Sequence, residues 1–289
     1  TLASLEEIIT MPQGMLLVTG PTGSGKSSTL CACLNQLNTR QVNIVTVEDP
    51  VEFEIKGVNQ VQINPLAGIT FASGLRSILR QDPDIVMVGE IRDAETASIA
   101  TQAAQTGHFV LSTLHTNDAP SALSRLLDLG VEPFLIAASL QAVLGQRLVR
   151  KICERCKAPD PLAPNTLKRL EPYLSTGRTP IFWRGMGCEA CQYTGYTGRT
   201  GIVEMLRITA GLRPKIEPGF SALALKKAAE REGFEPMFRD GIRKALEGLT
   251  TVEEVFRVSP AELESIAESE VIVSPFGQET SEEIASPEL

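Results

Sequence analysis

Residues 15–30 read MLLVTGPTGSGKSSTL, an apolar run that stops at glycines and a lysine and is followed by helix-forming residues. This order predicts a strand over Met15–Thr19, then a loop, then a helix whose apolar face carries Leu30, Cys33, Leu34 and Leu37. Residues 20–27 fit the phosphate-loop pattern G-x-x-x-x-G-K-[ST], in which glycines let backbone N–H groups converge on phosphate oxygens at a helix N-terminus. A glycine-rich turn before an ordinary helix is the alternative.

The expected nucleotide contacts come from this loop and from the first turn of the helix. Lys26 would reach the β- and γ-phosphates, and Ser27 would bind Mg²⁺. The residues expected to hold ATP or ADP are Gly20, Pro21, Thr22, Gly23, Ser24, Gly25, Lys26, Ser27 and Ser28.

The charge of the chain is unevenly distributed. Its 289 residues are 43% hydrophobic, which is enough for one large or two modest domains. Residues 258–289 hold eight glutamates and no lysine or arginine, so they account for the net charge of −8 and are expected to form a disordered acidic tail. The remaining body is neutral and the chain is only 5% aromatic, which argues against broad binding of nucleic acid.

The ends of the chain give further expectations. No window of 18 consecutive apolar residues and no signal peptide is visible, which predicts a soluble protein in a reducing compartment. The chain starts at Thr1 rather than at methionine, so we expect it to be an excised fragment. Ser4-Leu5-Glu6-Glu7 fits a capping box at the start of a short helix with Leu5, Ile8 and Ile9 as its apolar stripe.

Two further strands are predicted to deliver carboxylates to the phosphate loop. Val42–Val47 runs into the acidic segment Glu48–Glu52, and Ile85–Val88 runs into Gly89 and Glu90. Ligands of open α/β sheets bind at the carboxyl ends of the strands, so Glu48 and Glu90 are expected at the nucleotide, with Glu90 beside Mg²⁺. An acidic solvated turn is the alternative for the first segment.

The next part of the chain predicts one edge strand and two helices. Residues 58–63 alternate apolar and polar side chains, as a half-exposed strand does. A helix follows with Phe71, Leu75, Ile78 and Leu79 on its apolar face. Arg76 and Arg80 share another face of this helix, where arginines are more often solvated or paired than catalytic. Asp93 is expected to cap a helix over 94–106.

Of the only two histidines, His108 begins a predicted strand over 108–113 and His115 follows it. His115 follows this strand, where the γ-phosphate should lie, although a structural role is equally compatible with its position. His108 is a weaker candidate. Helices over 120–129 and 133–148 are expected to complete the α/β unit.

Two Cys-x-x-Cys pairs follow, formed by Cys153 with Cys156 and by Cys188 with Cys191. Four thiolates bind one structural Zn²⁺ in a tetrahedron, and disulfides are disfavoured in a reducing compartment. Residues 157–187 between the pairs contain five prolines, which suggests a hairpin-like excursion with little regular structure and too few apolar residues to fold by burial alone.

The last third predicts a turn-rich link over 195–201, a strand over 202–206, and helices over 222–232 and 236–247, with Thr251 opening a final short helix. The expected division of this α/β protein is residues 1–150 as the nucleotide-binding core, 151–200 as a tetracysteine zinc lobe, 201–257 as a C-terminal helical subdomain, and 258–289 as the acidic tail.

Four segments in this order resemble those of the secretion-superfamily motor ATPases: the phosphate loop, VEDPVE at 47–52, MVGEIRD at 87–93 and TLHT at 113–116. The cysteine pairs, with residues 195–204, make the chain similar to the GspE and PilB group of type II secretion and type IV pilus assembly ATPases, over residues 1–257. The resemblance implies a RecA-like phosphate-loop NTPase. It also implies that Glu48 orients or activates water, that Glu90 lies near Mg²⁺, and that His115 with His108 senses the γ-phosphate.

The same resemblance implies a cytoplasmic motor, peripheral to the inner membrane, that drives assembly of pilins or pseudopilins. Its partners would be an inner-membrane platform protein and a cytoplasmic adaptor. ATP would bind between subunits of a homo-hexamer, with arginines from an N-terminal domain that this chain lacks, so the chain alone is expected to be a weak ATPase for which Arg76 and Arg80 are the best local substitutes. A nucleic-acid motor of RecA-like fold and a non-hydrolysing, nucleotide-dependent assembly module are the alternatives.

Overall fold

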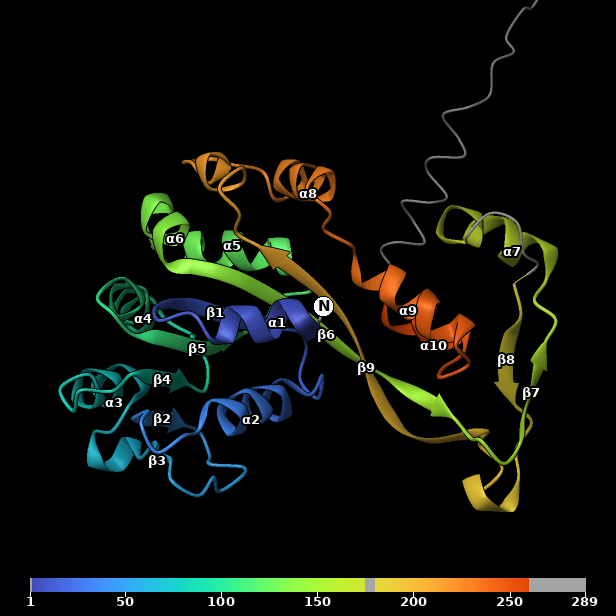
Figure 1. The fold of residues 1–289 in the computed structure, drawn as a ribbon, viewed down its shortest axis with the longest axis horizontal. Coiled ribbons are helices and arrows are strands. Elements are labelled where there is room, and N and C mark those ends of the chain that lie inside the picture. Colours follow the sequence, from blue (N-terminus) through green and yellow to red (C-terminus); the bar gives the residue numbers. More distant parts are fainter. Residues whose placement is uncertain (1, 175–179, 260–289) are drawn as a thin grey trace, which may run out of the picture.

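A seven-stranded sheet forms the centre of the molecule (Figure 1). The computed structural model describes residues 2–174 and 180–259. The strand order is β3-β2-β4-β5-β1-β6-β9, and all neighbours are parallel except β6 and β9. The strands are β1 (Gly14–Thr19), β2 (Ile44–Glu48), β3 (Asn59–Gln62), β4 (Ile85–Val88), β5 (Phe109–Leu114), β6 (Leu140–Ile152) and β9 (Tyr196–Arg207).

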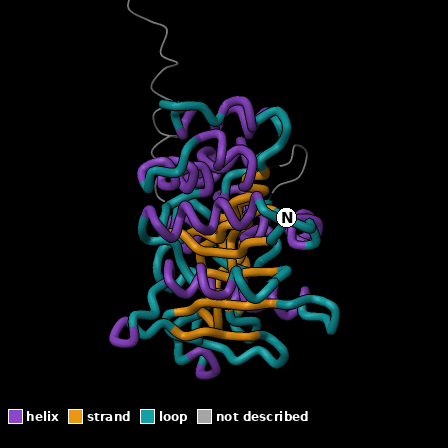
Figure 2. The backbone as a smooth tube through the Cα atoms, turned by 90° about the vertical axis from the view of Figure 1, so that its left-hand side faces the viewer, coloured by secondary structure: helices purple, strands orange, loops and turns teal. Residues whose placement is uncertain are grey.

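Helices cover both faces of this sheet, as Figure 2 shows from the side. They are α1 (Leu2–Ile9), α2 (Lys26–Leu37), α3 (Phe71–Ile78), α4 (Ala94–Gln105), α5 (Ala119–Asp128) and α6 (Pro133–Ser139). Successive strand residues point to opposite faces, so Leu16 and Val18 pack with α1 and α2 while Met15 and Leu17 pack with α3, α4 and α5. This layered arrangement confirms the predicted α/β class and brings the carboxyl ends of parallel strands to one edge.

The predicted N-terminal capping box is wrong. Helix α1 begins at Leu2, so Ser4 lies inside the helix and does not open it. The predicted apolar stripe is confirmed, because Ile8 and Ile9 are buried against the sheet. Packing of Ile8 and Ile9 against the sheet therefore determines where α1 lies, and the capping pattern at Ser4 does not determine where it begins.

The expected helix over 133–148 is also wrong in its second half. Helix α6 ends at Ser139, and residues 140–152 form the long strand β6, which pairs with β1 on one side and β9 on the other. A buried strand between two neighbours is apolar at successive positions, and such a run cannot be told from a buried helix by periodicity. Gly145 permits the pairing, because a Cβ there would lie 2.8 Å from the side chain of Glu204.

The segment between the cysteine pairs is more ordered than its prolines suggest. It contains the antiparallel strands β7 (Lys157–Asp160) and β8 (Phe182–Gly185) and the helix α7 (Pro164–Leu170). Leu170 and Phe182 are buried in an apolar cluster with residues of the C-terminal helices. The expectation of little regular structure is therefore wrong, because apolar partners far along the chain supply the missing core.

The C-terminal helices are close to their predicted positions: α8 (Ala222–Arg231), α9 (Met237–Leu246) and α10 (Val252–Val258). Thr251 caps α10 as expected, since its hydroxyl accepts from the backbone N–H of Glu254 at 3.2 Å. Short 3₁₀ helices are Pro65–Ala67, Glu171–Tyr173, Glu189–Cys191 and Arg213–Lys215. Residue 150 falls within β6 and residue 200 within β9, so the two expected boundaries cross paired strands; the division itself stays a prediction. Residues 260–289 of the expected tail lie outside the described residues.

Candidate nucleotide site and tetracysteine cluster

The phosphate loop joins the buried strand β1 to helix α2 as the motif predicts. Gly20, Gly23 and Gly25 have φ values of 150°, 77° and 88°, and Gly25 directly precedes the first residue of the helix. A Cβ at Gly20 would lie 2.3 Å from the carbonyl oxygen of Gln146. A side chain is therefore excluded at Gly20 by space as well as by backbone conformation.

Lys26 lies folded along this loop. Its Nζ donates to the carbonyl oxygens of Gly20 at 2.9 Å and of Pro21 at 3.1 Å. Burial lowers the pKa of Lys26, and the negative charge of Glu90 opposes that shift. The ammonium group is therefore held at the loop, where phosphate oxygens would replace the carbonyl contacts.

Glu90 follows the end of β4 and is 8% exposed. Its carboxylate pairs with Arg92, and its Oε2 lies 3.4 Å from Nε2 of His115. That approach does not have hydrogen-bond geometry, so Oε2 is a buried oxygen without a hydrogen-bond partner among the residues that the structure describes. Buried polar atoms are normally satisfied, which makes this oxygen a place for a ligand, a metal-bound water or a metal.

Glu48 is held at the end of β2 by its neighbours. Its Oε1 accepts from the hydroxyl of Thr46 at 2.6 Å and from Nε2 of Gln60 at 2.9 Å. Both bonds reach the same oxygen, so the orientation of the carboxylate is fixed by the sheet.

These side chains meet in one cleft of about 480 Å³. It is lined by residues 22–28 of the phosphate loop and helix, and by Glu48, Glu90 and His115. The three candidate catalytic residues therefore lie around one cavity, whereas Gly20 and Pro21 are not among the residues that line it.

His108 is not at this cleft. It precedes β5, where its carbonyl accepts from the backbone N–H of Gly14 at 3.1 Å, and its Nδ1 lies 3.1 Å from the carbonyl oxygen of Ala103. Gly14 starts β1, so His108 lies at the amino ends of the strands and the phosphate loop at their carboxyl ends. The implied pairing of His108 with His115 at the γ-phosphate is corrected by this placement.

Arginines reach the cleft from positions other than the expected ones. Arg76 pairs with Glu95 at 2.5 Å on the surface, and neither Arg76 nor Arg80 lines the cleft. Arg92 and Arg199 do line it. Arg199 stands on β9, about 170 residues from the phosphate loop, and only the strand pairing brings it there.

Gln146 is a second residue that sequence reasoning missed. It is 6% exposed on β6, its Nε2 donates to the carbonyl of Ser24 at 2.8 Å, and its Oε1 accepts from the hydroxyl of Thr29 at 2.7 Å. The amide thus braces the phosphate loop and the first turns of α2 from the neighbouring strand. A helix over 140–148 would not pair with β1, so the sequence prediction gives no reason to expect Gln146 beside the phosphate loop.

The four cysteines Cys153, Cys156, Cys188 and Cys191 form one cluster. Their Sγ atoms lie within 4.8 Å of one another, and three of the separations are 3.8–3.9 Å. None of the four forms a disulfide. Although burial opposes the shift, N–H groups of Cys188 and Gly195 lower the pKa of Cys191 to about 6, whereas burial raises the pKa of Cys156 to about 12.

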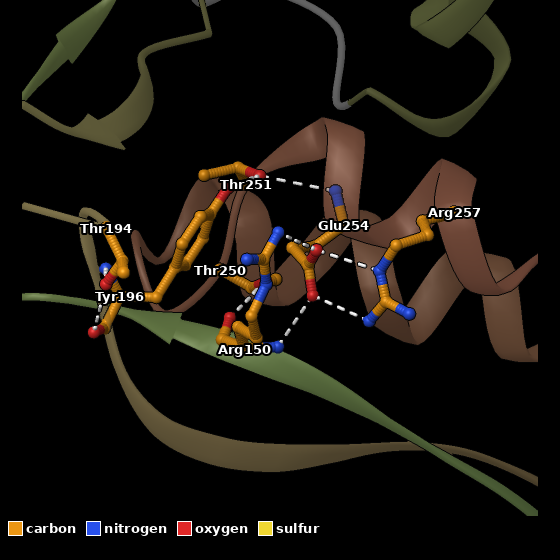
Figure 3. A network of polar contacts seen from close by, with 7 residues as sticks. All are labelled: Arg150, Thr194, Tyr196, Thr250, Thr251, Glu254 and Arg257. Atoms are coloured by element: carbon orange, nitrogen blue, oxygen red, sulfur yellow. Dashed lines mark hydrogen bonds and ion pairs between the residues drawn. The ribbon is translucent and has the colours of Figure 1, made fainter.

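A polar network joins the β6–β9 pair to helix α10 (Figure 3). Glu254 is 1% exposed and accepts from the backbone N–H and side chain of Arg150 and from the side chain of Arg257, at 2.7–2.9 Å. The guanidinium of Arg150 also lies 4.1 Å from the ring centroid of Tyr196. Burial acts to raise the pKa of Glu254, but these bonds outweigh it and hold the pKa at about 2.

Across residues 2–174 and 180–259, no helix combines the length and the apolar character that a membrane span requires.

Comparisons with known proteins agree with this geometry. The family model for "Type II/IV secretion system protein" matches residues 1–257. The chain is 53% identical over 250 residues to the type IV pilus assembly ATPase PilB of Thermus thermophilus, covering 86% of this chain and 28% of that protein. It is 52% identical over 255 residues to the type II secretion system protein E of Aeromonas hydrophila, covering 88% of this chain and 50% of that protein.

A solved structure of the pilus retraction motor PilT with bound ADP is similar with a TM-score of 0.67 and 29% identity, over 91% of this chain and 66% of that chain. The ATPase DotB of Legionella pneumophila shares the fold, with a TM-score of 0.65 at 24% identity. The predicted RecA-like fold of this group is confirmed, although the chain spans half or less of the curated relatives' length. On the family match and the identities together, the chain belongs to the type II/IV secretion system protein family.

Proposed function

We propose that this chain is the ATP-hydrolysing motor part of a type II secretion or type IV pilus assembly machine. One observation carries the proposal: the phosphate loop, Glu48, Glu90 and His115 line a single cleft at the carboxyl ends of parallel strands. The relatives' names, type II secretion system protein E and type IV pilus assembly ATPase PilB, support the class of machine.

In this proposal the chain contributes position and charge. Lys26 and the loop amides hold the phosphates, Glu48 orients the attacking water, and Glu90 lies opposite the phosphates beside His115. The cleft also fits Mg²⁺, because the hydroxyl-bearing Ser27 lines it and the Oε2 atom of Glu90 is buried and unsatisfied. Bound Mg²⁺ would neutralise charge on the phosphates.

We further propose that the tetracysteine cluster holds Zn²⁺. At a Zn–S distance of about 2.3 Å, the edges of a regular tetrahedron measure about 3.8 Å. The three separations of 3.8–3.9 Å between Sγ atoms fit that figure, and four thiolates leave no open position, as in a structural site.

The assembly is proposed on the resemblance to the secretion-superfamily motor ATPases and on the names of the relatives. We propose a homo-hexamer with ATP between subunits, located at the cytoplasmic face of the inner membrane, with a platform protein and a cytoplasmic adaptor as partners. We keep the division into core, zinc lobe, helical subdomain and acidic tail as part of this proposal.

A phosphate-release assay on the full-length protein tests whether it hydrolyses ATP. Lys26→Ala should abolish nucleotide binding measured by calorimetry, and Glu48→Gln or Glu90→Gln should lower turnover about a hundredfold or more while nucleotide still binds. Glu230→Gln, on the exposed side of α8, is the matched control. A wild-type protein that binds ATP without releasing phosphate would be a non-hydrolysing assembly module, and normal turnover in both glutamine variants would remove these carboxylates from the reaction.

A further inference from the structure

We infer that Gln60, on the edge strand β3, is a positioning residue that fixes both Glu48 and the rim of the nucleotide cleft for hydrolysis. This inference rests on the proposed function, in which Glu48 orients water. Gln60 itself lines the cleft, but its side-chain bonds are made to Glu48 and to the preceding segment 49–58 rather than to the phosphate loop.

The side-chain amide of Gln60 makes three hydrogen bonds. Its Nε2 donates to Oε1 of Glu48 at 2.9 Å and to the carbonyl of Phe53 at 3.0 Å, and its Oε1 accepts from the N–H of Ile55 at 2.8 Å. A carbonyl can only accept and an N–H can only donate, so Phe53 and Ile55 together determine which end of the amide faces Glu48. The donor toward Glu48 is thus set by the backbone.

Sheet register explains why this donor reaches Glu48. Strands β2 and β3 are parallel, and Gln60 lies opposite Thr46. Both residues donate to the same oxygen of Glu48, at 2.6 Å from Thr46 and 2.9 Å from Gln60. Two donors on one carboxylate oxygen restrict rotation of the group, which keeps the second oxygen in a constant direction for a water molecule.

The same amide holds the segment that borders the cleft. Residues 49–58 connect β2 to β3, and their members Glu52 and Phe53 line the cleft. Gln60 bonds this segment twice, through Phe53 and Ile55. The Gln60 side chain therefore joins the carboxylate of Glu48 to the segment 49–58, so a displacement of that segment would also displace the carboxylate.

Gln62 provides a matched control on the same strand. Its Oε1 accepts from the N–H of Val51 at 3.4 Å, so it also contacts the connecting segment. Its backbone pairs with Glu48 across the strands, but among the described residues its side chain makes no hydrogen bond to the Glu48 carboxylate. Removing Gln62 therefore tests the loss of a loop contact, whereas removing Gln60 tests the loss of that contact together with the bond to Glu48.

Measurements of kcat and of the Kd for ATP distinguish a role of Gln60 in hydrolysis from a role in nucleotide binding. Gln60→Ala should lower kcat about 10- to 100-fold and leave the Kd for ATP within about twofold, because the phosphate loop is untouched. Gln60→Glu keeps an acceptor for Ile55 but places a carboxylate beside Glu48, so its kcat should fall at least as far; it also replaces the alanine variant if that variant folds poorly. Gln62→Ala should change kcat less than about threefold.

A double-mutant cycle with Glu48→Gln decides whether Gln60 acts through Glu48. In the Glu48→Gln background, measured in single turnovers, Gln60→Ala should lower the rate less than about threefold further. Equal rate losses in both backgrounds, or an equal loss with Gln62→Ala, would overturn this inference and leave the proposed motor intact. Normal turnover of Glu48→Gln would overturn it together with the role of Glu48, and absence of wild-type hydrolysis would overturn the proposed function.

Discussion

The nucleotide cleft and the tetracysteine lobe both hold polar groups in fixed positions, but with different amounts of buried chain. The cleft stands on β1, β4 and β5, all of whose residues are buried, and on two large apolar clusters. The lobe has a two-stranded sheet and a small cluster that includes Leu170 and Phe182. In the cleft the charged side chains stand on strands that burial alone holds in place, whereas around the four thiols much less buried chain is present.

Removing the metal should give the largest effect and should separate the two regions. Chelation of a reduced, zinc-loaded preparation is expected to lower amide-exchange protection in residues 153–156 and 188–195 about a hundredfold or more, because metal–thiolate bonds supply folding free energy there. The Kd for ATP should stay within about twofold. Two results would contradict this prediction. One is elemental analysis that finds no metal in the untreated protein, and the other is a loss of amide-exchange protection in the cleft residues as large as that around the cysteines.

A smaller effect is expected at Glu254, which joins helix α10 to strand β6. Glu254→Gln should lower the free energy of unfolding at pH 7 by about 2–3 kcal/mol, since a buried carboxylate is removed from two arginines. The folded pKa of about 2 lies below the ordinary value of 4.5, so this stabilisation is complete above pH 4.5 and is lost as the pH falls toward 2.

Urea unfolding at pH 7, 4.5 and 3 measures this dependence, with Glu253→Gln on the exposed side of the same helix as the control. The difference between wild type and Glu254→Gln should shrink at pH 3. A difference that stayed constant down to pH 3 would show that the stabilisation does not come from the ionised carboxylate.

The smallest effect should come from Arg76, on the surface of the cleft-bearing core. Its partner Glu95 and Arg76 itself have side chains that are 57% and 51% exposed, and exposed pairs are screened by water and salt. Arg76→Ala should change the free energy of unfolding by less than about 0.5 kcal/mol, measured by urea unfolding. A loss above about 1.5 kcal/mol would mean that the core depends on surface charges as well as on burial.

The sequence predicted those features that a local pattern encodes. The phosphate loop, the carboxylates at the ends of β2 and β4, and the cysteine cluster are predictable because each is specified within a few residues. The strand β6 was missed from residue 140 onward, because burial between two strands erases the alternation that marks a strand.

Contacts that depend on this strand could not be predicted for the same reason. Gln146 reaches the phosphate loop and Arg199 reaches the cleft only through the pairing of β1, β6 and β9. His108 lies at the opposite edge of the sheet from His115, because strand β5 separates the two residues; its place at the γ-phosphate is implied by the resemblance and not by a local pattern.

The 13-residue strand β6 has a mechanical consequence. Gln146 touches the phosphate loop, and Cys153 of the cysteine cluster lies seven residues further along the chain, a span of about 23 Å at about 3.3 Å per residue. Because β6 pairs with β9, this span is a two-stranded antiparallel ribbon, which Figure 1 shows extending from the sheet toward β7 and β8. A tilt of about 5° of the paired strands at Gln146 would move the far end of this span by about 2 Å, so a small change in strand direction beside the phosphate loop would become a larger displacement at the cysteine cluster.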